Sequence, residues 1–408
     1  MNIVFITEFN IECLSGASFI RISELAKAFA KEGHIVYLTS LNSNNYELVK
    51  TANIHSSHLN IVGKGNFTRK NYFIDKYFNL SFRYAQLKQI VKYFDSKDTI
   101  FIVYNFFSTY FEERKYNRYL KRKGFRIIAE KNELSFGIAL NQKASKNIRF
   151  FPSLIIKMLN IANGFLTDRL IKSYDGVIAI SKYFEENARK HKVPVIRIPI
   201  LYPKFSTNII VSKKSPFKIG YFGTLSPKRD LIMELIRAIE ILILRKEKVE
   251  LSITGNASSQ NIKIIQSTIK KRNLENNVFF HGYLPMEQLT ELQIKQDLLV
   301  VLRSKTLQGR ATFATKLANY MHLGKIVLAS DIGDNSLFIN DHIDGFLIDG
   351  SEPHIIAEKI LEIKNLSLEK QKTIANKARD NAMRSFYYAN YSGALSQFLN
   401  SLKNYDTQ

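Results

Sequence analysis

The sequence is poor in residues that crosslink a chain or anchor it in a membrane. Its 408 residues include one cysteine, Cys13, and no tryptophan. A single cysteine excludes a disulfide framework and a cysteine-rich zinc site, and it is typical of a reducing compartment. No apolar run reaches the roughly 18–20 residues that a membrane-spanning helix needs. The opening residues MNIVFITEF predict a buried strand and lack the features of a signal peptide, so we expect a cytoplasmic protein.

Apolar residues are abundant enough to build folded domains. Hydrophobic residues make up 45 % of the chain and aromatic residues 12 %, with 29 Phe and 20 Tyr. These fractions exclude wholesale disorder and a collagen-like repeat. At about 100–200 residues per domain, the length predicts two domains.

Basic residues outnumber acidic ones, 59 to 36, for a net charge of +23. Residues 51–172 hold 22 basic and 8 acidic residues, a net charge of +14. Three clusters in or near this stretch, at 67–94, 114–126 and 143–172, carry large apolar residues between their charges. A single such segment is explained by a helix with its charges in water. Three in one half favour a surface that faces an anionic membrane.

Nucleic acid is the rival partner for a basic surface with aromatic residues. The sequence contains no zinc finger, RNP aromatic motif or helix-turn-helix signature. We therefore expect an anionic membrane surface as a partner and no nucleic acid.

Short apolar runs alternate with amphipathic stretches in two series. Residues 2–7 and 35–40 predict strands, with a helix at 21–32 between them. A second series begins at 217, after the stretch 199–216, which holds three of the eight prolines and predicts a linker. Such alternation predicts an α/β protein with two doubly wound parallel sheets.

One loop of the second series has the chemistry of an anion site. The residues GYFGTLSPKRD at 220–230 place a glycine turn, Lys228 and Arg229 before a helix. Backbone amides, two cations and a helix N-terminus together can hold a phosphate group. A solvated basic turn is the alternative.

Four segments of the second half carry a family resemblance: 220–230, the strand ends at 251–255 and 278–284, Leu298–Ser330, and 331–347. They resemble the retaining glycosyltransferases of the GT-B fold, group 1 or family 4 (glycogen-synthase-like), which use nucleotide sugars. The likeness covers nearly the whole chain but is sharp only in 217–350. It implies two Rossmann-like domains facing across a cleft, with a C-terminal helix crossing back to the first. The expected parts are an acceptor-binding domain at 1–198, a linker at 199–216, a donor-binding domain at 217–380 and the crossover helix at 381–408.

The resemblance also implies roles for individual residues. Cations and an acceptor-facing carboxylate are expected at the reacting centre: Lys228, Arg229, Lys316 and Glu133. Glu133 belongs to the sequence EKNE at 130–133, and a salt-bridged loop carboxylate is its alternative reading. The expected donor-binding residues are Gly16, Gly223, Thr224, Gly255, Tyr283, Leu284, Arg303, Thr315 and Asn319.

Three positions depart from the family pattern. Thr224 stands where the family has Arg, and Ala311 and Asn319 replace the two Glu of its E-x7-E motif. An Asn can still donate and accept hydrogen bonds to a ribose, but it lacks the charge of a carboxylate.

The implied reaction is transfer of a sugar from a nucleotide sugar to a hydroxyl acceptor with retained anomeric configuration. The leaving diphosphate takes the acceptor proton, and neither a metal nor another cofactor is expected. The basic first half suggests a lipid-linked glycan acceptor, hence a peripheral protein of the inner membrane face in cell-surface polysaccharide synthesis. Two alternatives remain: a non-catalytic glycosyltransferase-like subunit, prompted by Ala311 and Asn319, and a basic nucleic-acid-binding protein.

Overall fold

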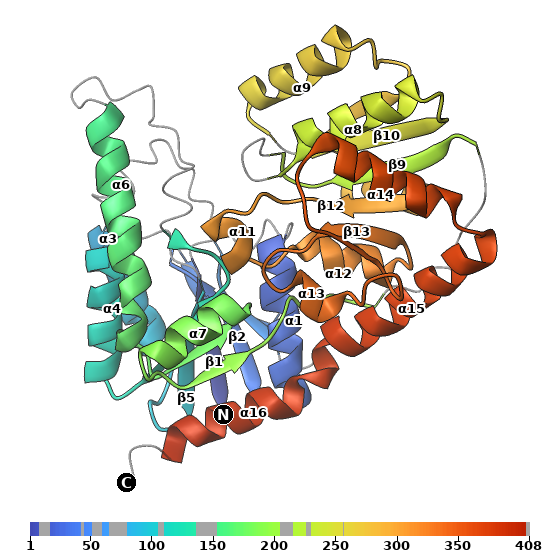
Figure 1. Cartoon of the computed structure of the whole chain (residues 1–408). Helices are drawn as coiled ribbons and strands as arrows, with labels where there is room; N and C mark the ends of the chain where they lie inside the picture. The colour runs from blue at the N-terminus through green and yellow to red at the C-terminus, as the bar shows by residue number, and fades with distance from the viewer. Residues whose placement is uncertain are drawn as a thin grey trace. The chain divides into compact units, whose positions relative to one another are not determined.

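The computed structural model contains two compact units (Figure 1). The first unit is Met1–Leu201 together with Tyr388–Gln408, and the second is Tyr202–Tyr387. The structure describes the chain outside the following residues: 8–16, 42–44, 51–58, 65–79, 105–109, 136–152, 205–214, 226–229, 256 and 405–408.

The first unit is built on an eight-stranded sheet of order β3-β4-β2-β1-β5-β6-β7-β8. Its strands are β1 (Asn2–Thr7), β2 (Ile35–Ser40), β3 (Asn45–Lys50), β4 (Leu59–Lys64), β5 (Thr99–Tyr104), β6 (Arg126–Lys131), β7 (Gly176–Ala179) and β8 (Val195–Arg197). Neighbouring strands run parallel except for β3 and β4, which are antiparallel at one edge. Its helices are α1 (Ala17–Lys31), α3 (Leu80–Val91), α4 (Tyr110–Arg122), α6 (Ser153–Asp168), the 3-10 helix η1 (Arg169–Ser173), α7 (Lys182–Lys190), the 3-10 helix η2 (Tyr388–Asn390) and α16 (Ser392–Asn404).

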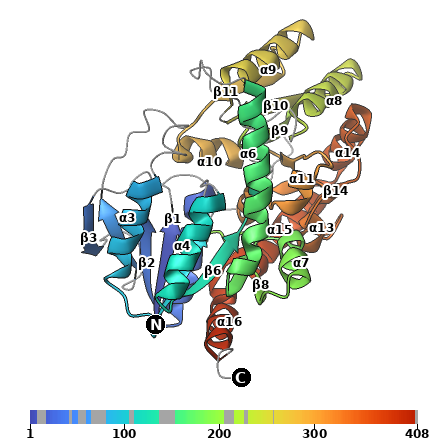
Figure 2. The same cartoon turned by 90° about the vertical axis from the view of Figure 1, so that its left-hand side faces the viewer.

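Helices cover both faces of this sheet because its central strands are apolar on both sides. Every residue of β5, TIFIVY, is buried. Ile100 and Ile102 point into a core shared with α1 and α16. Phe101, which points the other way, packs on Phe94 and Phe125, which follow α3 and α4. Figure 2 shows α3 and α4 on that side of the sheet.

The last helix completes the first unit although it lies at the far end of the sequence. Leu395, Leu399 and Leu402 of α16 are buried in the core of that unit. At Gly176, at the start of β7, a Cβ atom would lie 2.8 Å from Leu402 Cδ1, so glycine is needed for this close approach.

The second unit is built on a six-stranded sheet of order β11-β10-β9-β12-β13-β14, and each pair is parallel. Its strands are β9 (Phe217–Phe222), β10 (Val249–Thr254), β11 (Val278–Gly282), β12 (Leu298–Val301), β13 (Ile326–Ser330) and β14 (Phe346–Ile348). Its helices are α8 (Ile232–Leu244), α9 (Ser259–Lys271), α10 (Met286–Ile294), α11 (Leu307–Ala311), α12 (Thr315–His322), α13 (Asn335–Phe338), α14 (Pro353–Asn365) and α15 (Leu368–Phe386). Its apolar core joins the sheet to α8 and α14.

The two doubly wound sheets confirm the expected α/β fold class. The chain changes from one unit to the other at Leu201–Tyr202 and again at Tyr387–Tyr388. Residues 381–408, expected as one crossover helix, instead contain the end of α15, η2 and α16. Phe386 is fully buried in the second unit, and Tyr387 leaves α15 in an extended conformation before the chain re-enters the first.

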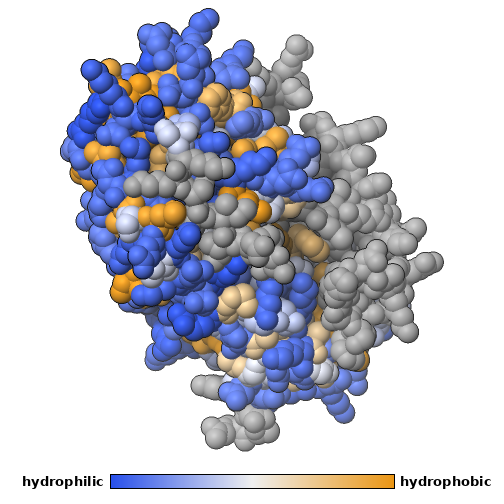
Figure 3. Space-filling model, turned by 90° about the vertical axis from the view of Figure 1, so that its right-hand side faces the viewer, coloured by the Kyte–Doolittle hydropathy of each residue, from blue (hydrophilic) through white to orange (hydrophobic). Residues whose placement is uncertain are grey.

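The surface gives no sign of a membrane span within the described part of the chain. None of its helices is long and apolar enough to cross a bilayer. On the face drawn in Figure 3, hydrophobic residues lie in small groups among hydrophilic ones.

Candidate functional site

The carboxyl ends of β9 and β10 approach so closely that only glycine fits. Gly223 and Gly255 both have a φ of 143°, and a Cβ atom on Gly255 would lie 1.6 Å from the carbonyl oxygen of Gly223. The amide of Gly223 donates to Thr254 (3.1 Å), and the amide of Gly255 donates to Gly282 at the end of β11 (2.9 Å). Ligands of open α/β sheets bind outside the carboxyl ends of the strands, which makes this edge the candidate site.

Lys316, in the first turn of α12, places its ammonium over this edge. A Cβ atom on Gly223 would lie 3.4 Å from Lys316 Nζ. The same nitrogen is 3.9 Å from Asp230 Oδ1 and 3.9 Å from the ring centroid of Tyr221. Thr315 is the half-buried first residue of the helix. A cation and a helix N-terminus therefore point to the same turn, an arrangement that favours an anion.

Arg303 supports the loop that leads into α12. It is only 8 % exposed, and its backbone pairs with Asp230 in an isolated antiparallel bridge. Its guanidinium donates hydrogen bonds to two oxygens of Thr312, the backbone carbonyl (3.2 Å) and Oγ1 (3.0 Å). Its backbone amide donates to Ser330 Oγ (2.9 Å). These bonds link the end of β13 to the start of the helix that carries Lys316.

The two positions of the expected E-x7-E motif lie in the interior. Ala311, the last residue of α11, is fully buried. Asn319 is 8 % exposed, and its Nδ2 donates to Oε1 of the buried Gln293 of α10 (3.1 Å). Sequence reasoning missed Gln293, because no local pattern pairs it with a residue 26 positions away.

The remaining donor-site residues differ in exposure. Tyr283 is 65 % exposed, just after β11, with the half-buried Leu284 next to it. Thr224 is exposed, and its carbonyl oxygen accepts a bond from Tyr221 Oη (3.1 Å). Gly16, Lys228 and Arg229 lie outside the described residues.

Lys325, another residue of the family-like segment, has a structural position. It precedes β13, and its Nζ donates to the carbonyl oxygens of Ile294 and Gln296 (2.9 Å to the latter). Burial lowers the pKa of Lys325 to about 8. It therefore lies at the amino ends of the strands, opposite the edge where Gly223 and Gly255 meet.

In the first unit, the two carboxylates of the EKNE segment have different surroundings. Glu130 is buried and pairs with the buried Arg21 (Oε1 to Nε, 2.9 Å). Burial raises the pKa of Glu130, and the Arg21 charge opposes that rise. Asn132 Nδ2 donates to its other oxygen (2.8 Å). Glu133 is half-buried where the chain leaves β6, so of the two it is the one that a ligand can approach.

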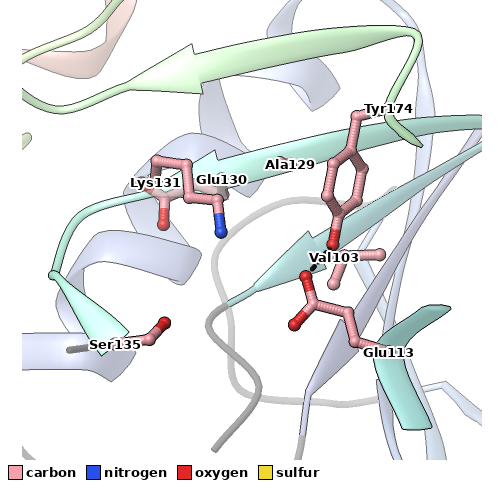
Figure 4. Close-up of a pocket in the computed structure, with 7 residues that line it drawn as sticks. All are labelled: Val103, Glu113, Ala129, Glu130, Lys131, Ser135 and Tyr174. Carbon is pink, nitrogen blue, oxygen red and sulfur yellow. Dashed lines mark hydrogen bonds between the residues drawn. The ribbon is translucent and has the colours of Figure 1, made fainter. Parts of the chain in front are cut away.

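A small polar cavity of about 10 Å³ lies at the same edge of the first sheet (Figure 4). Tyr174 donates its hydroxyl proton to the carboxylate of Glu113, and Lys131 points into the same space. Burial raises the pKa of Glu113, and the Lys131 charge counteracts it. The cavity is lined by Val103, Glu113, Ala129, Glu130, Lys131, Ser135 and Tyr174. Its volume is that of about one water molecule.

No group of three His, Cys, Asp or Glu that could hold a metal ion occurs among the residues the structure describes.

Comparison with known proteins finds a family match within the second unit. Residues 205–381 match the family model described as glycosyl transferases group 1. A curated relative, poly(ribitol-phosphate) alpha-N-acetylglucosaminyltransferase of Staphylococcus aureus (strain COL), is 26 % identical over 169 residues. The match covers 41 % of this chain and 32 % of that relative, so it spans about a third of the relative's length.

Solved structures match the fold over almost the full chain. Sucrose-phosphate synthase from Thermosynechococcus elongatus superposes with a TM-score of 0.68 at 15 % identity, covering 98 % of each chain. TarM has a TM-score of 0.68 at 15 % identity, over 99 % of this chain and 98 % of that one. HepE of Anabaena, in complex with UDP and glucose, has a TM-score of 0.65 at 17 % identity, and the match covers 98 % of this chain and 99 % of that one.

Proposed function

We propose that this protein is a nucleotide-sugar-dependent glycosyltransferase, because residues 205–381 match the model of the glycosyl transferases of group 1 and the chain has the GT-B fold. The observation that carries the proposal is the close approach of Gly223 and Gly255 beneath the ammonium of Lys316. Glycine leaves this turn without side chains, so a sugar-linked diphosphate can approach the backbone closely and meet the cation of Lys316 and the first turn of α12.

In the proposed reaction the anomeric configuration of the sugar is retained. The bond between the anomeric carbon and the diphosphate oxygen breaks, and the acceptor oxygen bonds to the same face of that carbon. The acceptor proton passes to the departing diphosphate. Negative charge grows on the diphosphate as it leaves, so Lys316 and the first turn of α12 stabilise the transition state more than the ground state. Lys228 and Arg229 are proposed to contribute further positive charge that stabilises the leaving diphosphate.

Thermal shift with UDP-, GDP-, ADP- and CMP-sugars tests donor binding. We expect one class to raise the melting temperature of the wild type, because a ligand stabilises the state that binds it. Lys316→Met should remove most of that shift and lower the transfer rate about 100-fold or more. The matched control is Lys270→Met, an exposed lysine of α9, which should behave as the wild type. A full shift and rate in Lys316→Met would contradict this donor site.

We propose that no metal ion takes part in the transfer, because the cations of the chain itself would neutralise the leaving diphosphate. Turnover should continue in the presence of EDTA. Turnover that stops in EDTA and returns on adding a divalent cation would contradict this.

The proposed acceptor is a glycan, carried by a lipid, in the synthesis of a cell-surface polysaccharide. The name of the curated relative, an enzyme acting on poly(ribitol-phosphate), supports a surface polymer as the acceptor class. The net charge of +14 over residues 51–172 supports an anionic, membrane-bound carrier. Glu133, half-buried after β6, is proposed to bind an acceptor hydroxyl. We propose that the protein is cytoplasmic and peripheral on the inner membrane face.

The interior positions of Ala311 and Asn319 favour one second candidate, a non-catalytic subunit with the same fold. Asn319 is bonded to Gln293, so its amide is engaged within the unit. Such a subunit would release no nucleoside diphosphate with any donor and acceptor, whereas an enzyme would.

A further inference from the structure

Helix α6 exposes an apolar stripe. Met158, Leu159, Phe165 and Leu166 are 62 %, 54 %, 49 % and 38 % exposed, and we call these four residues the α6 stripe. Spacings of one, seven and eight residues place them on one side of a helix, and the exposed Ala162 lies between them. A helix on the surface of a globular domain normally buries such a stripe, so this one marks an interaction surface.

The other side of α6 is attached to the first unit. Gly164 and Thr167 are buried. Asn163 Oδ1 accepts a hydrogen bond of 2.8 Å from the backbone amide of Tyr110, at the start of α4. Figures 1 and 2 both show α4 and α6 side by side. The α6 stripe is therefore the outward side of a helix whose packing side is already occupied.

Helix α4 adds positive charge beside the stripe. Its exposed residues are Phe111, Arg114, Lys115, Arg118, Lys121 and Arg122. Its two acidic residues, Glu112 and Glu113, are each only 2 % exposed. Lys121 pairs with Asp175 (2.8 Å), and just beyond α6 the guanidinium of Arg169 lies 4.1 Å from the ring centroid of Phe165. Within the described residues of α4, α6 and η1, no exposed side chain is acidic.

We propose that the α6 stripe and the exposed cations of α4 dock the first unit on an anionic lipid bilayer. The inference rests on the proposed function and deepens it, because it names the surface by which the enzyme meets a membrane-bound acceptor. Apolar side chains that enter the acyl boundary and cations that meet anionic headgroups are the two signals that peripheral attachment needs.

Other occupants fit this surface less well. A second copy of the chain would bring like charges of α4 and η1 against each other, which opposes association. A nucleic acid would require aromatic residues on which bases stack, whereas three of the four stripe residues are aliphatic or Met. A bilayer accepts both the apolar side chains and the positive charge.

Co-sedimentation of the full chain with vesicles tests the proposal. Vesicles of phosphatidylcholine are compared with vesicles in which part of it is replaced by phosphatidylglycerol. We expect binding to the anionic vesicles that weakens at high salt. Arg114→Glu with Arg118→Glu should weaken it roughly 10-fold or more, as should Leu159→Ser with Phe165→Ser.

The control variants carry changes of the same kind in the second unit. Lys270→Glu with Lys271→Glu reverses two exposed charges of α9, and Leu244→Ser removes a leucine that is 77 % exposed. These controls should bind vesicles as the wild type does. Equal binding to neutral and anionic vesicles would overturn the proposal, as would controls that weaken binding as much as the α4 and α6 variants. A wild-type dimer that Leu159→Ser with Phe165→Ser converts to a monomer, without vesicle binding by either, would overturn it in favour of a second copy.

The donor thermal shift separates this inference from the proposed function. None of the four sets of variants changes a residue of the proposed donor site, so all should keep the wild-type shift. Circular dichroism of each variant checks that it folds. Vesicle binding without any donor shift would contradict glycosyl transfer and leave the docking surface standing. A donor shift without vesicle binding would contradict the docking surface and leave the proposed glycosyl transfer standing.

Discussion

Among the glycines of the second unit that the structure describes, Gly255 has the least room for a side chain. Alanine there would place its Cβ 1.6 Å from a carbonyl oxygen in addition to requiring a φ of 143°. We expect Gly255→Ala to lower the free energy of unfolding of the second unit by about 4 kcal/mol and to abolish donor binding.

Gly282→Ala is the matched control for this prediction. Gly282 has a φ of 70°, and no heavy atom lies within 4 Å of the point that a Cβ atom would occupy, so only backbone strain of about 1–2 kcal/mol opposes alanine. Urea unfolding of the two variants measures the difference. Equal losses would show that the contact between the two strand ends relaxes freely.

Lys325 makes stability depend on pH. Its pKa is about 8 in the folded chain, against an ordinary value of 10.5. Between these values the unfolded chain binds more protons than the folded one, so the Lys325 contribution to stability rises with pH across that window and is constant below it. Relative to Lys325→Met, the wild type should gain up to about 3 kcal/mol over this range.

Urea unfolding of the wild type and Lys325→Met at pH values on both sides of 8 measures this contribution. Lys295→Met, at an exposed lysine just after α10, is the control and should follow the wild type at every pH. A difference between wild type and Lys325→Met that stays flat with pH would contradict the prediction.

At the scale of elements, α16 is part of the first unit's core. Leu399 is fully buried there, so Leu399→Ala should cost about 2–5 kcal/mol by leaving a cavity. Ser401→Ala, at an exposed position of the same helix, should cost little. Thermal unfolding checks both. A small loss for Leu399→Ala would show that α16 packs loosely against the sheet.

Helices and strands of this chain could be predicted from the sequence where the spacing of apolar residues indicates one of the two. Apolar runs such as residues 2–7 and 35–40 form β1 and β2 because both faces of the sheet are covered. The antiparallel β3 lies at an edge of the sheet and was not among the strands predicted from the sequence. Contacts that join distant segments, such as Asn319 with Gln293, leave no local signal and required the structure.

The candidate site was predictable only in its outline. The glycines of the strand ends and Lys316 follow from the motifs, and the structure brings them together. The bonds of Arg303 to Thr312 and Ser330 could not be foreseen, because they depend on how the loop after α11 folds back. The different surroundings of Glu130 and Glu133 depend likewise on Arg21, which is more than a hundred residues away.

At the scale of the whole molecule, the positive charge is unevenly divided. Residues 51–172, all in the first unit, hold a net charge of +14 of the total +23. At the proposed donor site of the second unit, the cation Lys316 lies beside the buried Asp230. Among the described residues of the first unit, the basic side chains of α4 are instead exposed. Under the two proposals, charge serves two purposes in this chain: binding a small anion in the second unit and docking the first unit on an extended anionic surface.

The dependence of the first unit on Tyr388–Gln408 has a consequence for biosynthesis. As the ribosome releases the chain from its amino end, all eight strands of the first sheet emerge long before the helix that covers part of one face. The second unit is complete earlier than the first, because its own last residue precedes that helix. A nascent chain must therefore shield the uncovered apolar residues against which Leu395 and Leu399 later pack. A stop codon at the start of α16 would therefore damage the amino-terminal unit, whereas the second unit would be made in full.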